Sequence, residues 1–448
     1  MKQGLILLVL SVSLMGQTAA DAMRLFIPES GPGIRAQALG QAYLALADDI
    51  SGLYWNPAGI GQVKTPRFTL DIRHGALHHR ANYQDQITAS RLNWTRLNSL
   101  GILYPLSVSR GALTVALAYE RLGAVDDRLQ FSGFSTVPNA LVFLADNETV
   151  SAFDRNVLRQ GVVEENGGPA AWTAGISVAV SPTTLVGLSL RWRRGNDQYH
   201  YQFRQVDSQG NYSDFPEDYD TYDVDRYIRT TYRAWQLQLG TLTSLGRHLR
   251  LGLSLSPPFT YQVREVYTEE EILTYDNGDQ ETIRAADPGQ WDYAVTSAYQ
   301  VGAGLAFVSA RLTLSAAIRY QDFSQVAFAL KSMTILDEGY LDLVQENAVI
   351  RSDYRERITT HLGGEIMLVP GRLALQGGWQ HVSPITATDQ ARSFFSGGLR
   401  YAPDEILTLQ LSLTRESSTR QSADEFTPAP TVEALDRAGI ILGLDYNF

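Results

Sequence analysis

The chain has 448 residues, no cysteine and a formal net charge of -11. The acidic balance argues against a nucleic-acid-binding protein, which is normally basic, and the lack of cysteine excludes disulfides, thiolate metal sites and cysteine catalysis. Mean hydropathy is -0.15, and the one long apolar run, residues 4–15, is too short to span a membrane as a helix. A charged fraction of only 19%, with 37 Gly and 22 Tyr, favours a large β-structure with tight turns.

The N-terminus reads as a secretory signal peptide. Lys2 supplies the positive start, residues 4–15 the apolar region, and Ala20-Asp21-Ala22 the small-residue cleavage motif. We predict cleavage after Ala22, so that residues 1–22 are removed and the mature chain is exported. The alternative interpretation is a short buried helix.

From Pro66 to the C-terminus, apolar and polar residues alternate with the period of a β-strand. Residues 407–414, for example, alternate leucine with Thr, Gln and Ser. Fourteen strands are predicted in this way, near residues 66–76, 86–104, 111–122, 171–181, 184–205, 227–243, 248–266, 291–308, 311–326, 353–369, 372–383, 392–401, 406–417 and 432–448.

The connections between these segments alternate in length. Short turns such as 182–183 and 370–371 are separated by long connections, which lie near 77–85, 123–170, 206–226, 267–290, 327–352, 384–391 and 418–431. An even number of strands with all long loops at one end is typical of an outer-membrane barrel. Because hydrocarbon offers no hydrogen-bond partner to an open edge, the sheet must close. We therefore predict an all-β fold, a transmembrane antiparallel β-barrel of about 14 strands, with both termini in the periplasm.

Two further features support a membrane barrel. Aromatic residues on the predicted outward faces would form belts at the two membrane interfaces. They are Tyr104, Tyr119, Trp172, Trp192, Trp235, Tyr320, Trp379, Tyr401 and Tyr446. The last strand ends at Phe448, and a terminal aromatic residue resembles the signal read by the barrel-assembly machinery, which we expect as a partner during insertion.

Residues 23–65 do not alternate, and their Ala/Leu spacing suits short helices, with Asp49 and Asn56 as helix caps. In this segment the chain resembles the FadL/OmpP1/TodX family of outer-membrane transport proteins and their PorV/PorQ-like relatives. The resemblance rests on Arg35-Ala36-x-Ala38-Leu39-Gly40-x-Ala42-Tyr43, then Ala47-Asp48-Asp49, then Asn56-Pro57-Ala58.

The resemblance implies that residues 23–65 form a helical hatch that plugs the lumen of the barrel at 66–448. The hatch motif would consist of Arg35, Asp48, Asp49, Asn56, Pro57 and Ala58. It also implies an activity: an apolar ligand binds among the loops, enters the barrel and leaves sideways through a gap at a kink in the third strand. Here that strand ends at Leu122 and is followed by Gly123, which can mark a bend or an ordinary turn.

Charged residues gather on the predicted inward faces. They are Arg73, Arg91, Glu120, Arg191, Arg193, Arg250, Arg319, Glu365 and Arg400. Arginine suits a carboxylate head group, because it is always charged and binds with two parallel hydrogen bonds. The alternative is that these residues form salt-bridge ladders that fill the lumen.

The long connection 123–170 is rich in apolar residues, among them Phe131, Phe134 and Phe143. Such side chains must cover a ligand, a partner or one another. A ligand vestibule and a self-packed cap therefore both remain open.

Residues suited to metal binding or catalysis are present but poorly arranged. His74, His78 and His79 have metal-like spacing but are expected in a solvated loop, and the acidic run 207–220 lacks the spacing of a calcium loop. His361 and Glu365 share an inward face, with no serine fixed beside them. We predict no metal, no cofactor and no enzymatic activity.

The leading hypothesis is a FadL-like channel that takes up hydrophobic compounds, either long-chain fatty acids or hydrocarbons. The alternative is a PorV/PorQ-like protein that binds exported proteins or assembles with a secretion machine. The expected partners are outer-membrane lipid and lipopolysaccharide and an apolar small-molecule ligand, with no nucleic acid. The expected location is the outer membrane of a Gram-negative-type bacterium, and the expected state is a monomer.

Overall fold

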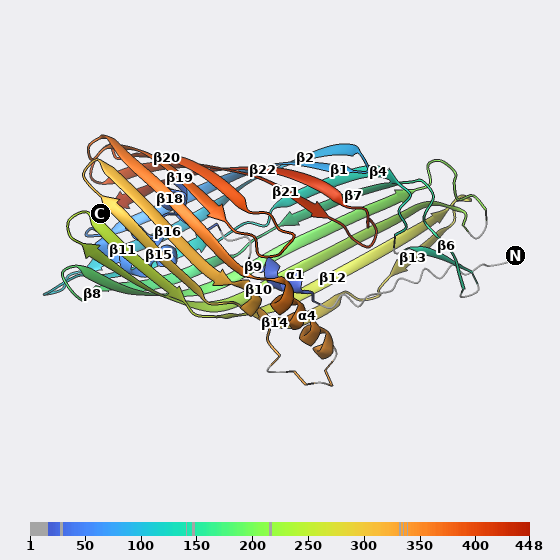
Figure 1. The fold of residues 1–448 in the computed structure, drawn as a ribbon, viewed down its shortest axis with the longest axis horizontal. Helices are drawn as coiled ribbons and strands as arrows, with labels where there is room; N and C mark the ends of the chain where they lie inside the picture. The colour runs from blue at the N-terminus through green and yellow to red at the C-terminus, as the bar shows by residue number, and fades with distance from the viewer. Residues whose placement is uncertain are drawn as a thin grey trace.

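The computed structural model describes residues 17–26, 30–139, 141–145, 148–214, 217–330, 333–334, 336–337 and 339–448, without the side chains between 143 and 151. The chain forms a closed antiparallel barrel of 14 strands, which confirms the predicted fold class (Figure 1). Closure is made by β1 and β22, which pair from Arg67↔Asn447 to Asn82↔Val432. Each predicted segment corresponds to one strand of the wall.

Four wall strands are interrupted, and each is built from two pieces. β3 (Leu113–Arg121) is followed by β4 (Asp127–Ser135), and β7 (Val157–Asn166) leads into β8 (Ala170–Ala179). β11 (Leu249–Ser256) is followed by β12 (Thr260–Tyr275), and β14 (Gly289–Thr296) leads into β15 (Gln300–Val308). The continuous wall strands are β1 (Arg67–Tyr83), β2 (Gln86–Leu106), β9 (Thr184–Val206), β10 (Tyr219–Leu245), β16 (Leu312–Asp322), β18 (Glu356–Val369), β19 (Leu373–Val382), β20 (Arg392–Tyr401), β21 (Leu407–Ser422) and β22 (Thr431–Asn447).

The two faces of the wall follow the predicted alternation, with one exception. Leu409 and Leu413 are exposed on the outside, and Ser412 between them is buried. Between β1 and β2 the register shifts: Asp71 faces Ser99 and Ile72 faces Leu97. The skipped residue is a β-bulge, and an extra residue reverses the side-chain parity of the strand beyond it. Arg91, predicted to point inward, is therefore exposed on the outside.

The long connections contain more strand than predicted. β1 runs on to Tyr83 and turns through Gln84 and Asp85, which have φ of 49° and 60°. The predicted loop 77–85 is thus a hairpin end, and most of 123–170 is strand as well, in β4, β5 (Val142–Ala145), β6 (Glu148–Ala152) and β7. The connection 327–352 holds β17 (Ala327–Phe328) and most of α4 (Tyr340–Asp353), and β13 (Gln280–Arg284) pairs with β12.

The wall has a tall side and a low side. In Figure 1 the orange strands β18, β19 and β20 end near the middle of the molecule, whereas β4, β7, β9, β10 and β12 run on toward the right. The right-hand end of the tall side holds a buried aromatic cluster, which we call the cap. It includes Phe131, Tyr201, Phe203, Tyr222 and Phe426, with ring centroids of Phe203 and Phe426 5.2 Å apart.

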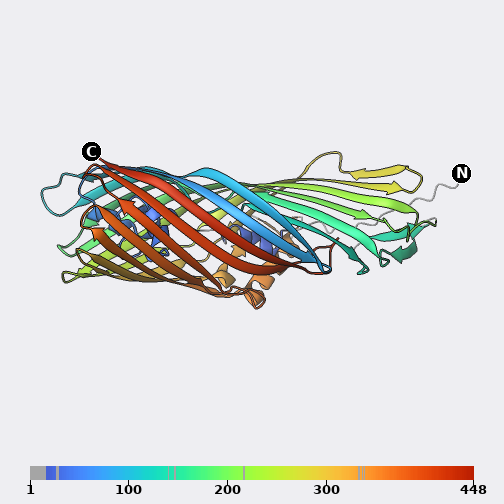
Figure 2. The same ribbon diagram turned by 90° about the horizontal axis from the view of Figure 1, so that it is seen from above.

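The N-terminal segment lies inside the barrel as α1 (Ala19–Arg24), α2 (Ile34–Ala38), α3 (Gly52–Trp55) and η1 (Pro57–Gln62) (Figures 1 and 2). We call residues 30–62 the hatch; it lies at the end of the barrel that holds the C-terminus. α1 spans the predicted cleavage point after Ala22, which stays a prediction. No helix in the described part of the chain is long and apolar enough to cross a membrane.

Candidate functional site: the hatch, the lumen and a gap in the wall

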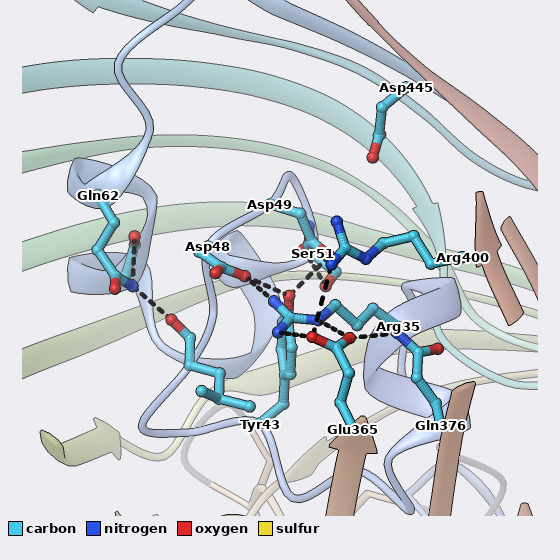
Figure 3. A network of polar contacts seen from close by, with 12 residues as sticks. Arg35, Tyr43, Asp48, Asp49, Ser51, Gln62, Glu365, Gln376, Arg400 and Asp445 are labelled. Carbon is cyan, nitrogen blue, oxygen red and sulfur yellow. Dashed lines mark hydrogen bonds and ion pairs between the residues drawn. The ribbon is translucent and has the colours of Figure 1, made fainter. Parts of the chain in front are cut away.

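A network of charges around Arg35 holds the hatch together and ties it to the wall (Figure 3). The Arg35 guanidinium lies 2.6 Å from Asp48 Oδ1 within the hatch and 3.0 Å from Glu365 Oε2 on β18. Gln376 of β19 donates to Glu365 at 2.6 Å, and Arg400 of β20 lies 3.6 Å from it. One arginine of the hatch motif therefore connects two segments that are 330 residues apart.

The neighbouring carboxyl groups Asp48 and Asp49 have opposite environments. Burial would raise the pKa of Asp48, but the charge of Arg35 and a hydrogen bond from Tyr43 outweigh it and hold the pKa below its usual value. Burial raises the pKa of Asp49, although the Ser51 hydroxyl donates to it at 2.6 Å, and the charge of Asp48 adds to the rise. Asp48 thus forms the ion pair with Arg35, whereas Asp49 accepts hydrogen bonds from Ser51 that fix the turn between them.

The Asn-Pro-Ala turn lies at the bottom of the lumen, pressed on the wall. Asn56 is fully buried, and its side-chain amide donates to the carbonyls of Leu44 at 2.8 Å and Thr241 at 3.0 Å. Its Oδ1 accepts from the Ala58 amide at 3.2 Å, which caps η1, with Pro57 at the first helical position. Ser177 of β8 donates to the Ala58 carbonyl at 2.8 Å.

Most of the inward charges predicted as ligand candidates contact the hatch. Arg191 donates to the Leu53 carbonyl at 3.2 Å, Arg250 to Gln62 Oε1 at 2.5 Å, and Arg319 to the Tyr54 hydroxyl at 3.4 Å. Glu365 and Arg400 belong to the Arg35 network. The structure therefore brings these residues together, in the lower lumen around residues 30–62.

Two of the inward candidates, Arg193 and Glu120, contact other wall residues, and Arg73 reaches only the first residue of the hatch. Arg193 donates to the Tyr261 hydroxyl at 2.6 Å, and Glu120 accepts from Thr173 at 2.9 Å. Arg73 donates to the Ser30 hydroxyl at 3.1 Å and forms no ion pair with any described residue.

Above the hatch lies a cavity of about 620 Å³. Arg73, Arg319, Arg357 and Arg392 line it together with apolar and aromatic side chains, among them Met23, Phe26, Trp94 and Phe394. Arg357 packs over the Phe323 ring at 4.6 Å and, like Arg73, makes no ion pair with a described residue. The lining is therefore mixed: it also includes the carboxylates of Asp126, Asp127, Glu165, Asp389 and Glu416, the last of which pairs with Arg392 at 3.3 Å.

The cavity reaches a break in the strand pairing of the wall, where β3 ends and β4 begins. Ladder pairing between β2 and β3 stops at Ser99↔Glu120, and residues 124–127, at the break, line the cavity. Arg96 of β2 reaches across and binds both carboxylate oxygens of Asp126 at 2.5 Å, and it donates to the Gly167 carbonyl at 3.0 Å. The sequence reasoning missed this bridge, since its only local signal is the Asp126-Asp127 pair after Gly123.

A groove of about 730 Å³ leads to the cavity from the low side of the wall. β20 pairs with β21 only as far as Phe394↔Glu416, so the edge of β21 beyond Glu416 is free on that side. Arg357, Ile385, Asp389, Arg392, Arg420 and Arg437 line both the groove and the cavity. The two spaces therefore share a boundary.

The phenylalanines proposed as a vestibule lie elsewhere. Phe131 is 3% exposed in the cap, with its ring 5.4 Å from that of Tyr83. Phe134 is half-buried, and the side chain of Phe143 lies outside the described residues. The vestibule role of this segment stays a prediction.

The histidines predicted in a loop lie in β1 instead. His74 and His78 point outward, whereas His79 is buried inside, 3.1 Å from Asp127 and 2.7 Å from Glu433. Alternation along a strand sends neighbours to opposite faces, so His78 and His79 cannot share a metal ion. The ring of His361 lies 2.9 Å from the Gly40 carbonyl, and Glu365 is held by Arg35.

A closed barrel with an N-terminal hatch inside it defines the class of plugged β-barrels. No protein-family model matches the chain, and no curated protein matches it in sequence. Among solved structures, the P. putida toluene transporter TodX matches with a TM-score of 0.58 at 12% identity, over 93% of this chain and 99% of that one. A Pseudomonas aeruginosa FadL homologue matches with a TM-score of 0.58 at 11% identity, over 94% and 99%.

The CymD monoaromatic hydrocarbon channel also matches, with a TM-score of 0.54 at 12% identity over 93% of this chain and 98% of its own. The chain therefore has the fold of the FadL/TodX-type channels. At these identities the likeness establishes the fold, and it agrees with the resemblance seen in residues 30–61.

Proposed function

We propose that this protein is an outer-membrane channel for the uptake of hydrophobic compounds. The observation that carries the proposal is the cavity of about 620 Å³ whose lining includes residues 124–127 at the break in the wall. In the proposed route a ligand in that cavity leaves at the side of the barrel, above the hatch, and reaches the membrane without crossing the hatch. TodX and CymD, which share the fold, are named as a toluene transporter and a monoaromatic hydrocarbon channel.

The proposed route has three stages. A ligand enters by the groove on the low side of the wall, passes Arg357 and Arg392 into the cavity, and leaves between β2 and the break after β3. The cap closes the tall side, because its aromatic rings pack on one another. Arg96 and Asp126 bridge the exit and would have to separate, or let the ligand pass beside them.

Within this function we propose long-chain fatty acids, or similar amphiphiles with an acid group, rather than bare hydrocarbons. Arg73 and Arg357 line the cavity and form no ion pair with a described residue, although Asp389 lines the same space. A cation without an ion-pair partner in a partly apolar cavity favours an anionic ligand, because a ligand carboxylate would supply that partner. A hydrocarbon would leave both charges unpaired.

The route is tested by filling the exit. Ala124→Trp and Val125→Trp place bulk in the cavity lining at the break, and Val180→Trp adds the same bulk at an exposed site in a short turn. In cells without another importer, we expect uptake of labelled oleate to fall at least about tenfold in the first two variants and to be unchanged in the control. Unchanged uptake in folded Ala124→Trp and Val125→Trp barrels would contradict the side exit.

The ligand class is tested separately with Arg73→Gln and Arg357→Gln. We expect oleate uptake to fall about tenfold, because an ion-paired hydrogen bond to the carboxylate is lost, and toluene uptake to stay the same. A loss of both would show that the arginines serve the structure of the lumen. No change in either would remove them from the ligand path.

A further inference from the structure

A pair of arginines on the outer face of the tall side is not explained by the route. Arg194 of β9 and Arg233 of β10 are directly opposed in the ladder, and both are exposed on the outward face. Like charges in this position repel one another and destabilise the sheet. Neither arginine forms an ion pair with any described carboxylate; their neighbour Arg264 is paired with Asp292 at 2.7 Å.

The pair stands at a sharp boundary on the outer face. On β9 the outward residues below it are Val186, Leu188, Leu190 and Trp192, and those above it are Asn196, Gln198, His200, Gln202 and Arg204. On β10 the residue below is Trp235, directly opposite Trp192 in the same ladder.

An aromatic row runs beneath the arginines across four strands. Tyr119 of β3 faces Trp172 of β8, Trp172 faces Trp192, and Trp192 faces Trp235. Aromatic side chains gather at the membrane interface, with apolar residues on one side and polar residues on the other. If the barrel is in the outer membrane as proposed, the two guanidinium groups lie at the depth of the lipid head groups.

We propose that Arg194 and Arg233 bind the phosphate group of a phosphorylated glycolipid in the outer leaflet, of the lipid A type. One phosphate between the two guanidinium groups would replace their repulsion by two charge-assisted hydrogen bonds. The acyl chains of the same lipid would lie on the apolar band below, over Leu188, Leu190 and Trp235. Arg194 also lies over the Trp192 ring at 5.6 Å, which leaves its donors free on the other side.

Charge complementarity favours a lipid over a second protein at this place. A protein partner would have to contact a surface whose lower half faces hydrocarbon, whereas a glycolipid has a phosphate and acyl chains in that order. The proposal rests on the proposed outer-membrane location and not on the uptake route.

The test measures lipid binding by the purified, detergent-solubilised protein. Lipid A with two phosphates and lipid A stripped of phosphate are titrated against wild type, Arg194→Gln/Arg233→Gln and Arg110→Gln, the last in an exposed short turn at the other end. We expect the double variant to bind bis-phosphorylated lipid A at least about tenfold more weakly, with Arg110→Gln like wild type. Arg194→Lys/Arg233→Lys should restore part of the binding, because the charge is kept.

Three results would overturn the proposal. They are equal binding by the double variant, equal binding of the phosphate-free lipid, and full competition by millimolar inorganic phosphate, which would show a site for the free anion. Oleate uptake by the double variant separates the two proposals. Lost lipid binding with intact uptake would support the lipid site without bearing on the route, and intact lipid binding would overturn the lipid site whatever the uptake.

Discussion

At the scale of single residues, the lumen shows why an inward charge is ambiguous in a sequence. Alternation correctly places Arg191, Arg319 and Glu365 inside the barrel, but it does not say whether the partner is a ligand or another part of the chain. The structure gives all three a partner in the hatch. A buried charge is tolerated only when it is paired, so a plugged barrel needs such groups wherever polar loops meet the wall.

The first prediction concerns the two neighbouring carboxylates of the hatch. Asp48→Asn removes one half of a 2.6 Å ion pair and leaves Arg35 with Glu365 alone, so the hatch should lose about 1–3 kcal/mol. Asp49→Asn should cost about 1 kcal/mol or less, because burial already disfavours the charge and an amide oxygen still accepts from Ser51. The chain has no cysteine, so a single Ala42→Cys at a buried hatch position reports opening by its rate of maleimide labelling. Equal labelling rates in both variants would contradict the assignment.

The second prediction is that the stability of the hatch depends on pH in two opposite ways. The raised pKa of Asp49 means that its charged form is penalised in the folded hatch, and this penalty is relieved as pH falls through that pKa. The lowered pKa of Asp48 means that its contribution is complete above the unfolded value of about 4 and is lost below it. The labelling rate of Ala42→Cys, divided at each pH by that of the same thiol in the denatured chain to remove the pH dependence of the thiolate, should therefore fall slightly on mild acidification and rise below about pH 4. Asp49→Asn should abolish the first change and Asp48→Asn the second.

At the scale of elements, the wall accommodates the hatch by leaving out side chains. Gly240 of β10 lies against Asn56, and Gly252 of β11 lies against the backbone of Leu44 and Ala45. A Cβ at either position would overlap the hatch, because the strand and the hatch backbone are in direct contact. The Asn-Pro-Ala turn and the glycines of the wall therefore form one fitted surface.

The third prediction tests that fit. Gly240→Ala places a methyl group against the Asn56 side chain and should displace it from the carbonyls of Leu44 and Thr241. We expect a loss of about 1–3 kcal/mol in hatch stability, from overpacking and a broken cap. Gly377→Ala, where no atom lies closer than 4.0 Å, is the matched control on β19. Faster labelling of Ala42→Cys in Gly240→Ala, with normal barrel assembly, is the expected result; equal rates in the two variants would argue against a fitted contact.

At the scale of the whole molecule, the number and order of the wall strands could be predicted from the sequence, because a lipid-facing strand carries a strong alternation. The length of the strands beyond these segments could not be predicted. Residues beyond the apolar outer band of the wall lose the alternation, so β4, β7 and the upper half of β1 read as loops. The bulge near Asn98 turned Arg91 from the inward to the outward face, and no residue pattern marks such a bulge.

The residues of the candidate site were predicted only in part, because some of its contacts join strands that are far apart in the sequence. Arg35, Asp48 and Asn56 were singled out through the family resemblance, and Asn56 also as a helix cap, which the structure shows at the start of η1. The sequence did not predict the Arg96–Asp126 ion pair or the shared boundary of the groove and the cavity. Both depend on strands that come together only when the barrel closes. Local spacing carries no information about such contacts.

The fourth prediction concerns the barrel as a barrier. A 14-stranded barrel is wide enough to need filling, and here the lower lumen is filled by residues 30–62, held by Arg35, Arg191 and Arg250. The full chain should therefore carry little ion current across a planar bilayer, although the cavity and groove are open to water. Deletion of residues 30–62 should raise the conductance at least about tenfold, since the polar inner wall would then line a continuous pore. If the deleted chain does not assemble, Arg35→Gln keeps the hatch but frees both Asp48 and Glu365, and it should produce brief openings instead. A full-length channel that conducts as well as the deleted one would mean that the hatch does not seal the lumen, and that ions already have a path beside it.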